Sequence, residues 1–115
     1  MFARRDMTLF PDDENGDILF GIWKRGGTLD VPRPVDFSLI FPTEEQAVAF
    51  AKDLQSRDGE VEVSYFEEKE CWDLRFSPTI VPSWSNISET ESWLGAAAEK
   101  YEGTNDGWGF FASEP

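Results

Sequence analysis

The sequence has 115 residues, a formal net charge of −13 and a composition that is 40% hydrophobic. A chain of this length and composition is expected to fold as one globular domain, residues 12–115, behind a flexible segment of residues 1–11. It contains no histidine and one cysteine. This excludes Ser–His and Cys–His nucleophile pairs, imidazole metal ligands and an intramolecular disulfide.

The first predicted element is a short helix behind an acidic segment. Residues 12–14 are acidic and suit the positive end of a helix dipole. An apolar stripe then follows at helical spacing, made of Ile18, Leu19, Ile22 and Trp23. Glycines at 26 and 27 are expected to end this helix, and Trp23 is expected to lie in the core.

A strand and a second helix are predicted next. Residues 35–41 alternate between apolar and polar side chains, which is typical of a half-buried strand. Residues 43–46 read Thr-Glu-Glu-Gln, a capping box in which the first and last side chains satisfy backbone donors of a helix start. Ala47, Phe50, Ala51 and Leu54 would form the buried stripe of that helix.

The second half of the chain predicts a hairpin, a helix and a closing strand. Residues 61–65 and 72–76 both alternate, with Trp72 on the apolar face, and a polar turn joins them. A second capping box at 88–91 predicts a helix, and 108–111 a final strand. The order is βαββαβ behind one extra helix. It predicts an α+β protein with a ferredoxin-like antiparallel sheet and helices on one face.

The motifs that could carry chemistry are weak. The acidic residues 12–17 resemble a calcium loop, but Pro11 and Ile22 occupy two positions where that loop needs oxygen ligands. Gly107-Trp108-Gly109 lacks the third glycine of a dinucleotide site. We therefore expect no metal, no cofactor and no enzymatic activity.

The negative charge is concentrated in residues 35–115, which hold seventeen acidic and five basic residues. Nucleic acids and anionic membranes are disfavoured partners, because both need clustered lysine and arginine. A basic protein partner fits better, although the acidity could serve solubility alone. Neither a signal peptide nor a membrane span is recognisable, so a cytoplasmic location is expected.

The candidate partner-binding residues combine exposed acids with tryptophans. Tryptophan is favoured as an anchor because it buries a large area while losing few rotamers. For Trp108, packing in the core and contact with a partner both remain open. The candidates are Glu67, Glu68, Glu70, Trp84, Asp106 and Trp108.

Three stretches carry a resemblance to a known family. They are the acidic string at 12–17, Val35-Asp36-Phe37, and Tyr101 followed by Asp106–Gly109. In these stretches the chain resembles the RraB family, the regulators of ribonuclease activity B, over roughly residues 12–112. The motif residues are Asp13, Asn15, Gly16, Asp17, Asp36, Phe37, Tyr101, Asp106, Gly107, Trp108 and Gly109.

The resemblance implies a small, acidic, non-catalytic domain with a ferredoxin-like fold. Members similar to the family's namesake bind a regulatory part of ribonuclease E, rich in basic RNA-binding segments, and reduce its cleavage of RNA. Two alternatives remain open. One is an immunity-like or stress-related binder of another basic protein, and the other is a domain that binds a small molecule.

Overall fold

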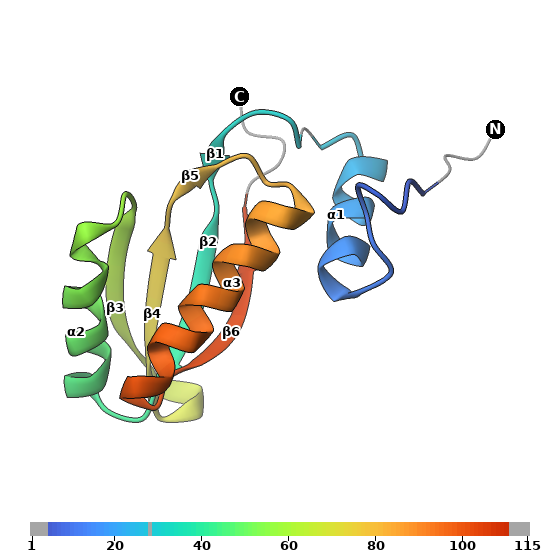
Figure 1. The fold of residues 1–115 in the computed structure, drawn as a ribbon. Helices are drawn as coiled ribbons and strands as arrows, with labels where there is room; N and C mark the ends of the chain where they lie inside the picture. The colour runs from blue at the N-terminus through green and yellow to red at the C-terminus, as the bar shows by residue number, and fades with distance from the viewer. Residues whose placement is uncertain (1–4, 28, 111–115) are drawn as a thin grey trace.

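The computed structural model describes residues 5–27 and 29–110 (Figure 1). Three α-helices are interspersed with six strands in this part of the chain, and three short 3-10 turns follow α2, β3 and α3. The elements are α1 Glu14–Lys24, β1 Arg33–Pro34, β2 Asp36–Phe41, α2 Glu44–Asp53, β3 Glu60–Phe66, β4 Cys71–Ser77, β5 Thr79–Ile80, α3 Trp84–Ala98 and β6 Thr104–Gly109.

The main sheet has four antiparallel strands within the described residues, in the order β3-β4-β2-β6. Phe37 in the central strand β2 lies opposite Phe76 of β4 on one side and Trp108 of β6 on the other. The short strands β1 and β5 pair separately. The predicted α+β class and the antiparallel sheet are therefore confirmed.

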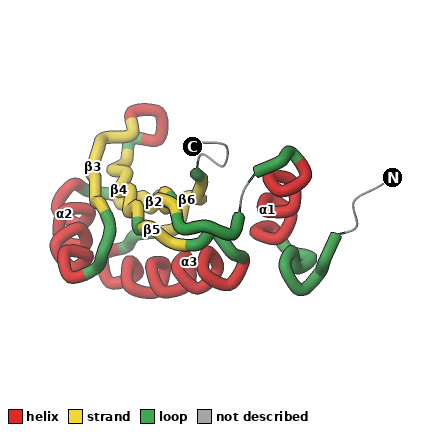
Figure 2. Tube along the Cα trace, turned by 90° about the horizontal axis from the view of Figure 1, so that it is seen from above, coloured by secondary structure: helices red, strands yellow, loops and turns green. Residues whose placement is uncertain are grey.

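Helices α2 and α3 lie on one side of the main sheet (Figure 2). Helix α2 contacts β2, β3 and β4, whereas α3 contacts β2 and β6. The rings of Phe41 and Phe50 lie 5.5 Å apart beneath α2, and those of Phe76 and Trp93 lie 5.8 Å apart beneath α3. Because Phe41 and Phe76 share a face in the strand register, both helices cover that same face.

The alternation predicted for β2 is confirmed. Its residues Phe37, Leu39 and Phe41 are buried under the helices, together with Val35 just before the strand. Asp36, Ser38 and Ile40 are half-buried and point to the opposite side of the sheet. We call this opposite side the open face, because α2 and α3 do not cover it (Figure 2).

Helix α3 begins earlier than predicted. Its N-cap is Ser83, whose hydroxyl accepts a hydrogen bond from the backbone N–H of Asn86 at 3.1 Å. The predicted capping box at 88–91 therefore lies inside the helix, where the Thr90 hydroxyl donates to the carbonyl of Asn86. The prediction missed that Ser83, directly after Pro82, already supplies a competent cap.

The closing strand also begins earlier than predicted. Strand β6 starts at Thr104, and its register against β2 shifts between Phe37 and Leu39. This irregularity adds a residue to β6 and breaks the simple alternation by which strands are found in a sequence. The predicted strand residue Phe111 lies outside the described part of the chain.

Helix α1 packs beside the sheet and contacts α3 (Figure 1). The predicted apolar stripe is right for Leu19, which is buried, but wrong for Ile18 and Trp23, which are 39% and 43% exposed. The buried line of α1 instead runs through Gly16 and Leu19. Phe10 from the preceding segment packs against Phe20 at 5.5 Å, so a segment without periodicity helps to bury α1.

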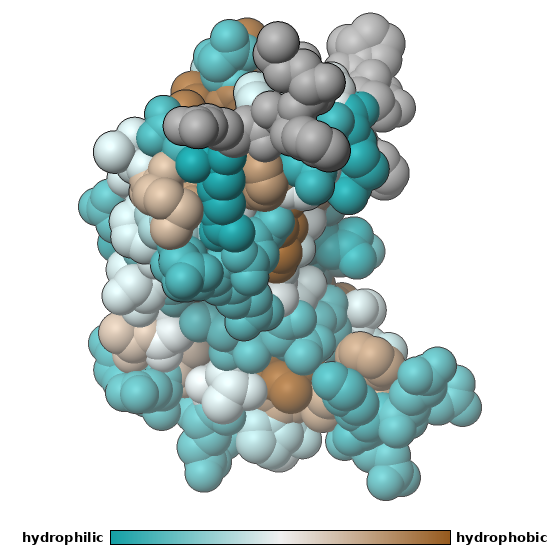
Figure 3. Space-filling model, turned by 90° about the vertical axis from the view of Figure 1, so that its right-hand side faces the viewer, coloured by the Kyte–Doolittle hydropathy of each residue, from teal (hydrophilic) through white to brown (hydrophobic). Residues whose placement is uncertain are grey.

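Residues Arg5 and Phe10 form contacts with α1. The flexibility expected for residues 1–11 stays a prediction. Seen from the side on which α1 lies, the surface is mostly hydrophilic with separate hydrophobic patches (Figure 3). Within the described residues, no helix has both the length and the apolar character that a membrane crossing requires.

Candidate protein-binding site

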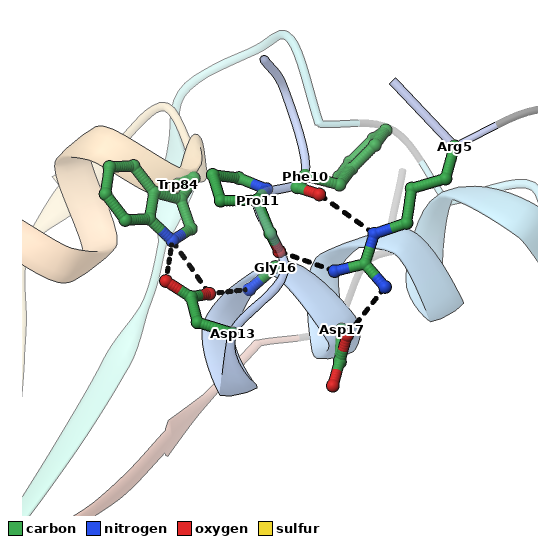
Figure 4. Close-up of polar contacts among 7 residues, drawn as sticks. All are labelled: Arg5, Phe10, Pro11, Asp13, Gly16, Asp17 and Trp84. Carbon is green, nitrogen blue, oxygen red and sulfur yellow. Dashed lines mark hydrogen bonds and ion pairs between the residues drawn. The ribbon is translucent and has the colours of Figure 1, made fainter. Parts of the chain in front are cut away.

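Asp13 links the start of α1 to the start of α3 (Figure 4). Its carboxylate caps α1 by accepting the backbone N–H of Gly16 at 2.7 Å. The same carboxylate accepts the indole N–H of Trp84, with Nε1 at 3.0 Å from Oδ1 and 2.9 Å from Oδ2. One motif residue thus both begins a helix and holds it against a second one.

Gly16 lies where the chain folds back onto α1 (Figure 4). A Cβ atom at this position would be 1.8 Å from the carbonyl oxygen of Pro11, a contact that no side chain can make. Arg5 crosses the same place, donating from Nε to the carbonyl of Phe10 at 2.8 Å and pairing with Asp17 at 2.6 Å. The glycine is needed for close approach of two backbone segments.

Asn15 joins α1 to β6 and α3. Its Oδ1 accepts the indole N–H of Trp108 at 2.8 Å. Its Nδ2 donates to the hydroxyl of Ser88 at 3.1 Å and to the carboxylate of Glu91 at 2.8 Å. The acidic string and the terminal aromatic motif, far apart in the sequence, are therefore in direct contact.

The remaining motif residues stabilise the sheet and its turns. Asp36 accepts a hydrogen bond from the Ser77 hydroxyl at 2.6 Å, and Phe37 is fully buried. Tyr101 donates its hydroxyl to Asp53. Gly107 has a φ of +109°, a conformation that favours glycine, and Gly109 lies opposite Asp36.

A hollow of about 450 Å³ opens on the open face beside the turn that joins β3 to β4. Glu67, Glu68 and Asp106, three of the predicted partner-binding residues, line it. Lys69 from the same turn reaches Asp106 at 3.3 Å. We call this hollow the turn-side hollow.

The other predicted partner-binding residues lie elsewhere. Glu70 ends the turn in a left-handed conformation with a φ of 50° and does not line the turn-side hollow. Trp84 and Trp108 are half-buried, and their indole N–H groups are bonded to Asp13 and Asn15. The candidates thus separate into an acidic group on the open face and two tryptophans that hold α1.

Sequence reasoning missed Asp73 and Arg75, which also line the turn-side hollow. The usable signal was the alternation of β4, since the residues between Trp72, Leu74 and Phe76 must point to the other face. Burial raises the pKa of the Asp73 carboxyl, and the nearby charges of Asp106 and Glu62 act in the same direction, whereas Arg75 opposes them.

Replacing Asp73 by asparagine is expected to raise the melting temperature at pH 7. The increase should be only roughly 2 °C, because solvent screens the charge of this partly exposed carboxylate. A carboxyl whose pKa is raised by folding destabilises the folded state wherever it is ionised. The gain should disappear as pH falls below the unfolded value of 3.8. Thermal melts at pH 7 and about pH 3 measure it, and an equal gain at both values would contradict it.

The remaining candidates for site chemistry are a thiol and an apolar groove. Cys71 is buried, and no group of three or more metal-ligating side chains occurs in residues 5–27 and 29–110. An apolar groove of about 550 Å³ lies between α1 and the start of α3, with Phe10, Leu19, Trp23 and Trp84 among its lining. It is separate from the sheet.

These features define a small acidic α+β domain in which side chains from segments far apart in the sequence hold one helix against a sheet and a second helix. The comparison with protein families identifies it further. Residues 12–110 match the family described as Regulator of ribonuclease activity B, RraB, and the chain therefore belongs to that family. A search of curated proteins finds no significant match.

Proposed function

We propose that this protein lowers the activity of a ribonuclease by binding a basic segment of that enzyme through its acidic surface. The observation that carries the proposal is the family match over residues 12–110. Ribonuclease E is the enzyme that the resemblance implies. Regulation of this kind requires no catalytic group in the regulator, so the chain acts as a binding protein and not as an enzyme.

The charge of the chain supports a basic partner. The net charge of −13 favours rapid encounter with cationic surfaces and disfavours direct binding to RNA. The same proposal assigns the protein to the cytoplasm, where ribonucleases act on messenger RNA. We also infer a ferredoxin-like arrangement, because the order β3-β4-β2-β6 and the covering by α2 and α3 are those of two interlocked β-α-β units.

Addition of the purified protein to the ribonuclease and an RNA substrate should slow RNA cleavage. Raising the salt concentration from about 0.1 M to about 1 M shortens the Debye length from about 10 Å to about 3 Å. The concentration of the protein needed for half-maximal inhibition should then rise about tenfold or more, since salt screens the attraction between an acidic surface and a basic one. Salt must also be varied with the ribonuclease alone, as the control.

Two outcomes would contradict the proposal. Inhibition that is equally strong at both salt concentrations would remove the electrostatic mechanism. Failure to bind or inhibit the ribonuclease, with tight binding to a different basic protein, would favour the immunity-like or stress-related alternative. A small-molecule function would instead be supported by a ligand that raises the melting temperature of the protein. A substitution of Trp23, which lines the apolar groove, should then prevent that ligand from binding.

A further inference from the structure

The open face carries a second hollow along β4. It measures about 520 Å³, and its acidic lining residues are Asp36, Glu60 and Glu62. We call it the distal hollow. Arg75 lines both the distal and the turn-side hollow, and so lies between them. The open face is therefore a trough with two acidic ends and one cation at its middle.

The trough has more negative charge than its own cations can neutralise. Across the two hollows, seven carboxylates face Arg75 and Lys69, and Lys69 is already paired with Asp106. Asp73 lines the turn-side hollow and feels the charge of Arg75, but it has neither a hydrogen bond nor an ion pair among residues 5–27 and 29–110. Apart from the Ser77–Asp36 hydrogen bond and the Lys69–Asp106 ion pair, these carboxylates add like-charge repulsion on one sheet face, which destabilises the fold.

We propose that the open face binds an extended arginine-rich segment of a protein partner, with one cationic side chain in each hollow and an uncharged residue above Arg75. The inference rests on the proposed function, because it names the surface and the partner chemistry by which a ribonuclease would be bound. Charge complementarity identifies the occupant, because a cationic segment can neutralise the two acidic hollows on this uncovered face of the sheet.

The strand geometry sets the spacing of the two cations. The turn-side hollow contains Asp73 and the distal hollow contains Ser77, four residues further along β4. At roughly 3.3 Å per residue, the two positions are about 13 Å apart. A partner segment lying extended along β4 turns alternate side chains toward it. Its cations therefore occupy positions i and i+4, and the residue at i+2 lies over Arg75.

Arginine suits these hollows better than lysine. Its planar guanidinium can bond a carboxylate through two parallel N–H groups. The turn-side hollow also has Phe66 in its lining, and a guanidinium can stack on an aromatic ring. Lys69 already lies over the Phe66 ring at 5.5 Å, so this ring accepts a cation in the folded protein.

A synthetic seven-residue peptide tests the spacing. Its arginines stand at positions 2 and 6, separated by glycine and serine, and the comparison peptide has the same composition with the two arginines adjacent. Titration at low salt, followed by fluorescence anisotropy, should show about threefold or more tighter binding of the spaced peptide. Equal affinity for both peptides would overturn the two-hollow arrangement.

Variants of exposed residues test the surface without risk to folding. The double variants Glu67→Gln/Glu68→Gln and Glu60→Gln/Glu62→Gln each neutralise one hollow, and all four residues are exposed. Each should weaken binding of the spaced peptide about three- to tenfold. The matched control, called the α3 control, combines Glu89→Gln in α3 with Glu99→Gln in the 3-10 turn that follows α3, and it removes the same charge from exposed positions off the open face.

Arg75→Gln should strengthen peptide binding, whereas the double variants above weaken it. Removal of the central cation should tighten binding of a peptide that carries a third arginine at position 4, which the original protein disfavours. If the two open-face double variants bind like the α3 control, the inference is wrong. Inhibition of the ribonuclease by the unmodified protein is measured separately. A failure of that inhibition would overturn the proposed function, whereas the peptide titrations alone test whether the open face binds an arginine-rich segment.

Discussion

Replacing Trp108 by alanine is expected to destabilise the protein by about 3 kcal/mol, toward the low end for deletion of a large aromatic side chain because Trp108 is only half-buried. The indole packs in the sheet opposite Phe37 and stacks on Phe110 at 6.0 Å, with an interplanar angle of 10°. It also supplies the hydrogen bond that Asn15 accepts. A thermal melt should show a decrease of roughly 10 °C.

Trp108→Phe separates the packing from the hydrogen bond. Phenylalanine retains a ring in the same place but leaves Asn15 Oδ1 without its indole donor, which should cost about 1 kcal/mol. A double-mutant cycle with Asn15→Ala would measure the coupling between the two side chains. The opposite result is also informative: if Trp108→Ala melts like the original protein and only loses its partner, Trp108 is a binding anchor and not a packing residue.

The strands were predictable because their signal is local. The alternation in β2, β3 and β4 was sufficient to find each strand, since one side of the sheet is covered by helices and the other is not. Strand β6 was less predictable. Gly107 interrupts its pattern, and the register shift against Leu39 places Asn105 and Trp108 on the helix-covered side together. Only the partner strand determines that arrangement.

The attachment of α1 could not be predicted from periodicity. The helix is held by polar residues of its own first turn, Asp13 and Asn15, which reach tryptophans distant in the sequence. Trp23 was expected in the core because it fits a helical stripe, yet Phe10 and the backbone of Pro11 occupy the neighbouring surface of α1. A segment without periodicity thus determined which face of the helix is buried.

The acidic part of the candidate site was predictable by residue type but not by position. Glu67, Glu68 and Asp106 were selected from the sequence, and they meet around the turn-side hollow only because β6 and the β3–β4 turn approach the same face. Asp73 and Arg75 were missed because their neighbours in β4 are apolar and suggest burial. The division of the face into two hollows by Arg75 depends on the alignment of three strands, which no single stretch of sequence contains.

Gly16→Ala is expected to destabilise the protein by about 3 kcal/mol, the upper part of the range for an overpacked site. The added Cβ would meet the Pro11 carbonyl oxygen at 1.8 Å, and because both groups belong to backbone, neither can move aside by a change of rotamer. The segment through Phe10 would have to leave α1, with the loss of the Arg5–Asp17 ion pair. Circular dichroism melts should show a decrease of roughly 10 °C.

Gly21→Ala in the same helix is the matched control. A Cβ there would meet only the end of the Arg25 side chain at 3.4 Å, and that flexible group can move. Alanine should therefore stabilise α1 by up to about 1 kcal/mol, its advantage over glycine in a helix interior. Opposite shifts from one substitution at two positions of α1 would establish close backbone approach at Gly16 as the cause. Similar stabilisation of both variants would mean that Pro11 does not lie against α1 in solution.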